Sequence, residues 1–157
     1  MTRSDKQLDR NWNELLQELR VTQTGAQVLT GFLLTLPFTP KFGDLEPYQM
    51  SIYLATFVGS VATTGLLIAP VAFHRLLFRQ GQKPWLVRAA DVTAKLGLLL
   101  LAITTSAVMV LVFDVVLSWH SAQIAGVVTL LALLLLWVGT PAIAHWNNPG
   151  GDPPPSS

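Results

Sequence analysis

The sequence predicts an all-α membrane protein, a transmembrane antiparallel four-helix bundle whose first helix has an amphipathic N-terminal extension. Of its 157 residues, 51% are hydrophobic and 12% are charged, whereas soluble domains average about 25% charged residues. A helix of about 20 apolar residues crosses a hydrocarbon core of about 30 Å. Charged residues are excluded from four long stretches, which are 21–38, 52–73, 96–113 and 122–144.

The four predicted spans lie in a single domain, residues 1–146, and they differ in how apolar they are. The first is the weakest, because threonine and glutamine residues interrupt it. The third reaches spanning length if Asp91 and Lys95 lie among the lipid headgroups. Residues 130–138 of the fourth have no polar face, which argues against a soluble bundle. The predicted spans are 21–38, 48–73, 89–113 and 121–144.

Turn-forming residues separate the spans. Prolines and glycines lie in residues 38–47 and 81–84, and they would end one helix and begin the next. Ser118 or Ser121 would cap the last helix. Short connections favour antiparallel neighbours, which predicts an up-down arrangement. Residues 147–157 are rich in proline, glycine and serine and are expected to form a disordered tail.

The positions of the loop cations predict the orientation of the chain. Four Lys or Arg residues precede the first span and four lie between the second and third, whereas the two opposite connections contain only Lys41. Lys and Arg accumulate on the cytoplasmic side of membranes. We therefore expect a multi-pass protein of the cell inner (plasma) membrane with both termini in the cytoplasm.

The first helix carries the most unusual polar pattern. Its polar residues fall within a stripe about 100° wide on a helical wheel. Thr24 and Gln27 would join helices through hydrogen bonds worth about 0.6–2 kcal/mol each, line a polar pathway, or bind a partner protein. Amides without partners are costly in lipid, so the stripe is expected to face the bundle interior, a water-filled cavity or a partner. It consists of Arg10, Asn13, Gln17, Arg20, Thr24, Gln27 and Gly31.

Ionisable residues also lie near the predicted cytoplasmic ends of the spans. Glu14 and Glu18 are four residues apart and repel each other unless a cation intervenes. They would form either a solvated face with local salt bridges or a proton- or cation-handling site. His74, Arg75 and Arg79 stand in a basic segment that would bind anionic lipid headgroups.

Two further pairs of charged residues are candidates for local roles. Asp91 and Lys95 are spaced for an ion pair in the favoured order, which we interpret as an anchor at the start of the third span. Asp114 and His120 bracket the connection before the fourth span. An ordinary exposed loop is the simpler interpretation of that pair, and a pH-sensitive contact is the alternative.

A cluster of small residues in the second span predicts a close helix contact. Small side chains let two helices approach each other in a membrane. The contact would lie either within the chain or between two chains. The cluster consists of Gly59, Ser60, Thr63, Thr64 and Gly65.

The sequence has no signature of catalysis or of a cofactor. Cysteine is absent, and the three histidines lack the spacing of metal ligands. There is no phosphate-binding glycine loop and no nucleophile–base pair. The net charge of +1 does not indicate a nucleic-acid partner. We therefore predict no enzymatic activity, no metal and no cofactor.

Three runs of sequence carry a family resemblance: residues 13–25 (NELLQELRVTQTG), 31–38 (GFLLTLPF) and 69–79 (APVAFHRLLFR). They resemble a family of small actinobacterial membrane proteins of unknown function, over about residues 11–117. The resemblance implies a four-span protein, and some members bear the label sodium:proton antiporter. Such exchange needs a carboxylate near mid-membrane. Every acid here lies outside the predicted spans or at their ends, and Gln27 cannot exchange a proton.

Two functional hypotheses follow from these patterns. The first is a non-enzymatic accessory or scaffold protein that acts through the first helix and the basic segment 74–88. Its partners would be the lipid bilayer, anionic headgroups, and a second copy or another membrane protein. The second hypothesis is a small oligomeric transporter, coupled to cations or protons, in which Glu14, Glu18 or Asp91 opens onto a water-filled cavity.

Overall fold

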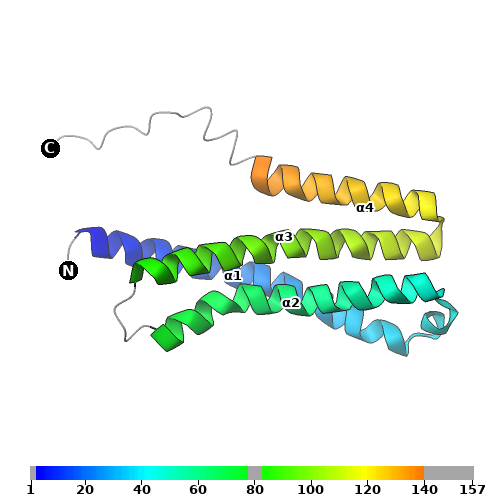
Figure 1. Cartoon of the computed structure of the whole chain (residues 1–157), viewed down its shortest axis with the longest axis horizontal. Coiled ribbons are helices and arrows are strands. Elements are labelled where there is room, and N and C mark those ends of the chain that lie inside the picture. The colour runs from blue at the N-terminus through cyan, green and yellow to red at the C-terminus, as the bar shows by residue number, and fades with distance from the viewer. Residues whose placement is uncertain (1–2, 78–82, 140–157) are drawn as a thin grey trace.

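The computed structural model describes residues 3–77 and 83–139, and all regular structure in these two ranges is helical. Successive long helices run in opposite directions (Figure 1), and α1 is joined to α2 through two short 3-10 helices, η1 (Leu36–Phe38) and η2 (Pro40–Asp44). A π-helical turn, η4 (Leu135–Gly139), follows α4. The predicted all-α class is confirmed over the described residues. The long helices are α1 (Arg3–Thr35), α2 (Pro47–Leu77), α3 (Lys83–Val116) and α4 (Trp119–Leu134).

Three of the four long helices are long and apolar enough to cross a membrane. The qualifying segments are Pro47–Phe73, Arg88–Val116 and Trp119–Gly139, which correspond to the second, third and fourth predicted spans. The first predicted span lies in α1, which does not qualify because of its polar residues. The last residues of the fourth span and the predicted tail lie outside the described ranges.

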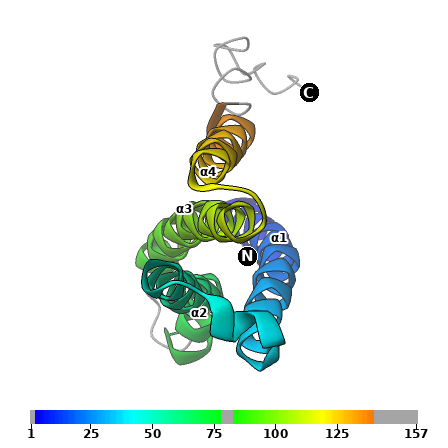
Figure 2. The same cartoon turned by 90° about the vertical axis from the view of Figure 1, so that its right-hand side faces the viewer.

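The four helices do not surround one common core. The largest contacts join α2 to α3 and α3 to α4, and α1 packs mainly on α2. Seen end-on, α1, α2 and α3 form one group, and α4 lies on the far side of α3 (Figure 2). This arrangement departs from the predicted four-helix bundle. One reason is that only one side of α4, marked by Ala122 and Gly126, is buried.

Small residues bring α2 and α3 close together. A methyl group at Gly59 would lie 2.9 Å from Thr104 Oγ1, and one at Gly97 would lie 2.8 Å from Leu67 Cδ2. Ser60 and Thr63 are buried, with hydroxyls that donate to carbonyls of their own helix. The predicted small-residue cluster therefore packs mainly within the chain. Gly65, at its edge, is exposed and has open space around it.

α4 is held against α3 by a similarly close contact. A methyl group at Gly126 would overlap the side chain of Val110. Ser118 is the N-cap, because its hydroxyl accepts from the Ser121 backbone N–H at 3.5 Å. This geometry selects Ser118 from the two predicted caps. We call the end of the molecule that holds η1, η2 and the α3–α4 connection the tight-turn end (Figure 1).

Candidate functional site

The described part of the polar stripe of α1, which begins at Gln17, is exposed rather than packed against the other helices. Gln17, Arg20, Thr24 and Gln27 are all exposed. The opposite side of α1 packs inward, with Ala26 and Leu33 almost completely buried. The bundle interior, one of the three predicted surroundings, is therefore not where the described part of the stripe lies. Together with the exposed Gly31, we call these residues the α1 outer face: Gln17, Arg20, Thr24, Gln27 and Gly31.

Among the described residues, Thr24 and Gln27 do not link α1 to another helix. The Thr24 hydroxyl donates to the Arg20 carbonyl of its own helix at 2.9 Å. Within the described residues, the Gln27 amide makes no hydrogen bond to another helix. The interhelical bonds predicted for these two residues are thus not formed within the part of the chain that the structure describes. Their remaining polar groups point to the outside of the molecule.

Part of α1 lies alongside a helix that is long and apolar enough to cross a membrane. Ala26 shares a buried cluster with Leu67 of α2, and Leu33 shares another with Tyr53. The Tyr53 hydroxyl donates to the Leu33 carbonyl at 3.0 Å. Since Tyr53 and Leu67 both belong to the qualifying segment Pro47–Phe73, the adjacent part of α1 lies alongside that segment. Gln27 therefore stands beside an apolar helix rather than beyond its end.

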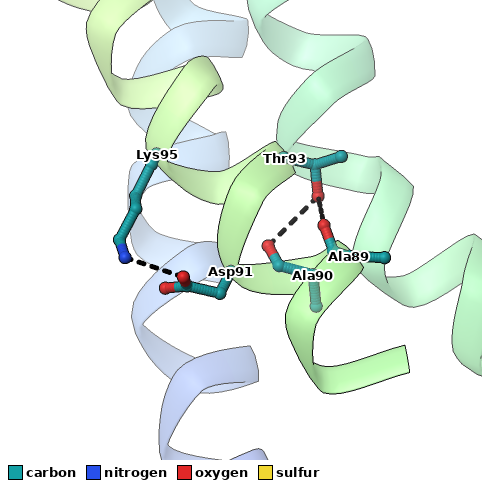
Figure 3. Close-up of polar contacts among 5 residues, drawn as sticks. All are labelled: Ala89, Ala90, Asp91, Thr93 and Lys95. Atoms are coloured by element: carbon teal, nitrogen blue, oxygen red, sulfur yellow. Dashed lines mark hydrogen bonds and ion pairs between the residues drawn. The ribbon is translucent and has the colours of Figure 1, made fainter. Parts of the chain in front are cut away.

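The ion pair predicted on α3 is confirmed. Lys95 Nζ lies 2.7 Å from Asp91 Oδ2, one turn away on the same helix (Figure 3). Both side chains are well exposed, at 73% for Lys95 and 47% for Asp91. Nearby, the Thr93 hydroxyl donates to the carbonyls of Ala89 and Ala90. The exposed pair neutralises its own charges, which suits an anchor near the end of a span.

The other predicted site residues lack described side chains. Glu14 and Glu18 fall within the helical backbone of α1, and His74 and Arg75 within that of α2. Arg79 lies outside the described ranges. The backbone places the end of α2 and the beginning of α1 toward the same end of the molecule (Figure 1). The proposed roles of these five residues remain predictions.

A polar cluster at the tight-turn end was missed by the sequence interpretation. The Asp114 carboxylate accepts two hydrogen bonds on Oδ2, from the Tyr48 hydroxyl at 2.6 Å and the Gln49 amide at 2.7 Å. Gln49 is buried, and its carbonyl oxygen accepts from the Glu46 backbone N–H. Trp119 packs edge-on against Tyr48, with ring centroids 5.9 Å apart. Asp114 is therefore a link between helices rather than part of an exposed loop.

The sequence indicates that Asp114 needs hydrogen-bond partners, but it does not identify them. Asp114 directly follows an uncharged stretch, and Tyr48 and Gln49 begin another. A carboxylate at the end of an apolar span needs hydrogen-bond donors. Which donors it finds depends on how α2 and α3 are aligned, and the spacing within one helix does not determine that alignment.

The side chains in the described residues do not gather into a metal site. No group of three or more His, Asp or Glu residues lies close enough together to bind an ion among them.

Comparison with known proteins identifies a family. No curated protein and no solved structure matched the chain in these comparisons. Residues 2–141 match the family of unknown function DUF6328. Because the match covers nearly the whole sequence, the chain belongs to this family of unknown function.

Proposed function

We propose that the protein is a non-enzymatic, multi-pass membrane protein that holds a helical membrane partner against the α1 outer face, in an accessory or scaffold role. The supporting observation is that Thr24 and Gln27 are exposed beside a helix of membrane-spanning length. In this proposal α1 is the fourth span, the helices form an antiparallel transmembrane assembly, and both termini lie in the cytoplasm.

The energetics of lipid favour a partner at this face. An amide that faces hydrocarbon without a hydrogen bond costs several kcal/mol. A polar side chain on a neighbouring helix offsets part of that cost, at about 0.6–2 kcal/mol per hydrogen bond. The carboxamide of Gln27 both donates and accepts, so it can pair with Ser, Thr, Asn or Gln of a partner helix.

The outer face also has the shape that a helix contact requires. Gly31 has open space around it, because apart from its own neighbouring backbone no heavy atom lies within 4 Å of the position that a Cβ would occupy. Small residues next to hydrogen-bonding ones are typical of helix–helix contacts in membranes, because they allow the backbones to approach closely. The partner is therefore a transmembrane helix with polar side chains, from a second copy or from another protein.

Basic residues at the end of α2 would support this contact by binding lipid headgroups. His74 and Arg75 stand in the last turns of α2, and Arg79 follows in the sequence. Basic residues near an anionic membrane surface contribute about 1 kcal/mol each. Binding to headgroups would fix the depth of α1 and keep its outer face in register with the partner.

The described carboxylates favour an accessory role over proton-coupled transport. Asp91 is paired with Lys95 near the start of its segment, and Asp114 is bonded to Tyr48 and Gln49 near the end. A proton pathway requires ionisable groups within the membrane. Between these ends, the described part of α3 contains no acidic residue.

Cysteine crosslinking tests the proposal directly, because the chain contains no cysteine of its own. Thr24→Cys and Gln27→Cys variants would carry a benzophenone maleimide, and irradiation would be performed in the native membrane. We expect protein adducts from both positions. A protein adduct of twice the 17.1 kDa chain mass indicates a second copy, and a protein adduct of another mass indicates a different protein.

The matched control is Val128→Cys on the apolar, exposed side of α4, which should give lipid adducts only. Equal protein adducts from Val128 and Gln27 would contradict the proposal, as would their absence at Gln27. Gln27→Leu combined with Thr24→Val should abolish co-purification of the partner, whereas Gln27→Asn should retain part of it. Cation-dependent proton flux that Glu18→Gln abolishes would instead establish the transporter.

A further inference from the structure

An apolar cavity of about 160 Å³ opens at the tight-turn end, at the opposite end of the molecule from the last turns of α2 (Figure 1). Its wall combines residues of η1, η2 and their flanking positions with Tyr53 of α2 and the last turns of α3. Apart from Thr39 and Lys41, its lining side chains are hydrophobic or aromatic. The residues that matter most for its chemistry are Leu36, Lys41, Phe42, Tyr53, Leu111 and Val115.

The wall of this cavity is formed by well-fixed side chains. The Tyr53 hydroxyl is tied to the Leu33 carbonyl at 3.0 Å. The Phe42 ring meets the Tyr53 ring edge-on, with centroids 5.0 Å apart. Leu111 is 5% exposed. The cavity is thus formed before any ligand arrives, as ligand sites usually are.

A single cation stands at the rim. Lys41 lines the cavity, is exposed, and is the sole Lys or Arg between Arg20 and Arg75. Although Asp44 and Glu46 are close in sequence, Lys41 makes no ion pair with any carboxylate of the described side chains. A lysine stem can cover apolar surface while its ammonium group reaches water.

We infer that this cavity takes part of an acyl chain of an anionic phospholipid, with the phosphate paired to the Lys41 ammonium group. The cavity includes Val115 and Val116, which end the segment Arg88–Val116 that is long and apolar enough to cross a membrane. It therefore opens at the boundary between hydrocarbon and headgroups. An amphiphile bound there keeps its chain in apolar surroundings and its charge beside a cation.

The volume of the cavity limits how much of the lipid can enter it. Apolar cavities of about 150 Å³ stay dry and bind benzene, so this one accepts several methylene groups rather than a whole lipid. The headgroup and the rest of the molecule remain in the surrounding membrane. The lysine thus selects the charge of the lipid, and the cavity holds one segment of its chain.

Native mass spectrometry of the full-length chain in detergent, with phosphatidylglycerol or phosphatidylcholine added, tests this inference. We expect wild-type protein to retain phosphatidylglycerol better by about fivefold, as expected for one basic residue near a charged lipid. Lys41→Gln should remove that preference. Val115→Trp should fill the cavity and lower the retention of both lipids.

Each variant has a matched control on the same chain. Lys95→Gln removes an equal charge from a lysine outside the cavity whose ammonium group is already paired with Asp91, and Val92→Trp adds the same ring at an exposed position of α3. Both controls should retain phosphatidylglycerol like the wild type. Equal retention of the two lipids by wild type would overturn the inference. So would losses in the two controls as large as those in Lys41→Gln and Val115→Trp.

Discussion

α1 and α4 both lie at the periphery of the α2–α3 pair, yet their exposed sides differ in chemistry. The outer side of α4 presents apolar side chains such as Ile124, Val128 and Leu131. The outer side of α1 presents Arg20 and Gln27 among its apolar residues. Hydrocarbon is a favourable environment for the apolar side chains of α4, whereas it is unfavourable for the polar side chains of α1. A peripheral position alone therefore does not distinguish the two helices, and the proposed binding face on α1 depends on its polar outer side.

The largest expected effect concerns the attachment of α4. Gly126→Val would force a side chain into Val110, so we expect a loss of about 1–3 kcal/mol from overpacking. Thermal unfolding in detergent measures it. Gly65→Val, in open space on α2, is the control and should shift the unfolding midpoint far less. Equal shifts would show that α4 is not held through this contact.

The tight-turn end offers a comparison between two aspartates. Asp114→Ala removes the acceptor of the buried Gln49 amide, which should cost about 1–3 kcal/mol. Asp91→Ala breaks an exposed pair and should cost about 0–1 kcal/mol. Denaturation of both variants in the same detergent ranks them. The reverse order would mean that the Asp114 link does not stabilise the end where α4 begins.

The attachment of α1 depends in part on one hydroxyl group. Tyr53→Phe keeps the ring but removes the hydrogen bond to the Leu33 carbonyl, with an expected cost of about 0.6–2 kcal/mol. Hydrogen exchange of α1 amides should accelerate more than that of α4 amides. Uniform acceleration across the chain would show that the bond serves the whole fold.

The smallest expected effect on stability concerns Gln27, on the polar outer side that distinguishes α1 from α4. Gln27→Leu in the isolated chain should change the free energy of unfolding by less than about 0.5 kcal/mol, as exposed positions usually do. Its effect on partner capture should be large, as proposed above. If Gln27→Leu lowered the stability by more than this and did not reduce partner capture, Gln27 would contribute to packing within the chain rather than to partner binding.

The sequence predicted the helices better than their arrangement. The apolar length of three segments, the Asp91–Lys95 spacing and a serine cap for α4 depend on neighbours within a few residues, and the structure agrees with each. The direction of the α1 stripe, the attachment of α4 to α3 and the bonds of Asp114 depend on contacts between distant segments. A helical wheel shows which residues share a face, but it does not show what that face meets.

The shortness of one connection has a consequence for how the chain enters a membrane. Only Leu117 and Ser118 separate α3 from α4. If both helices span the membrane as proposed, the short connection would make them insert together as one hairpin. The more polar α1 would then insert together with α2, against which it packs in the folded structure. Biogenesis of the protein is thus expected to proceed in two paired steps rather than four single ones.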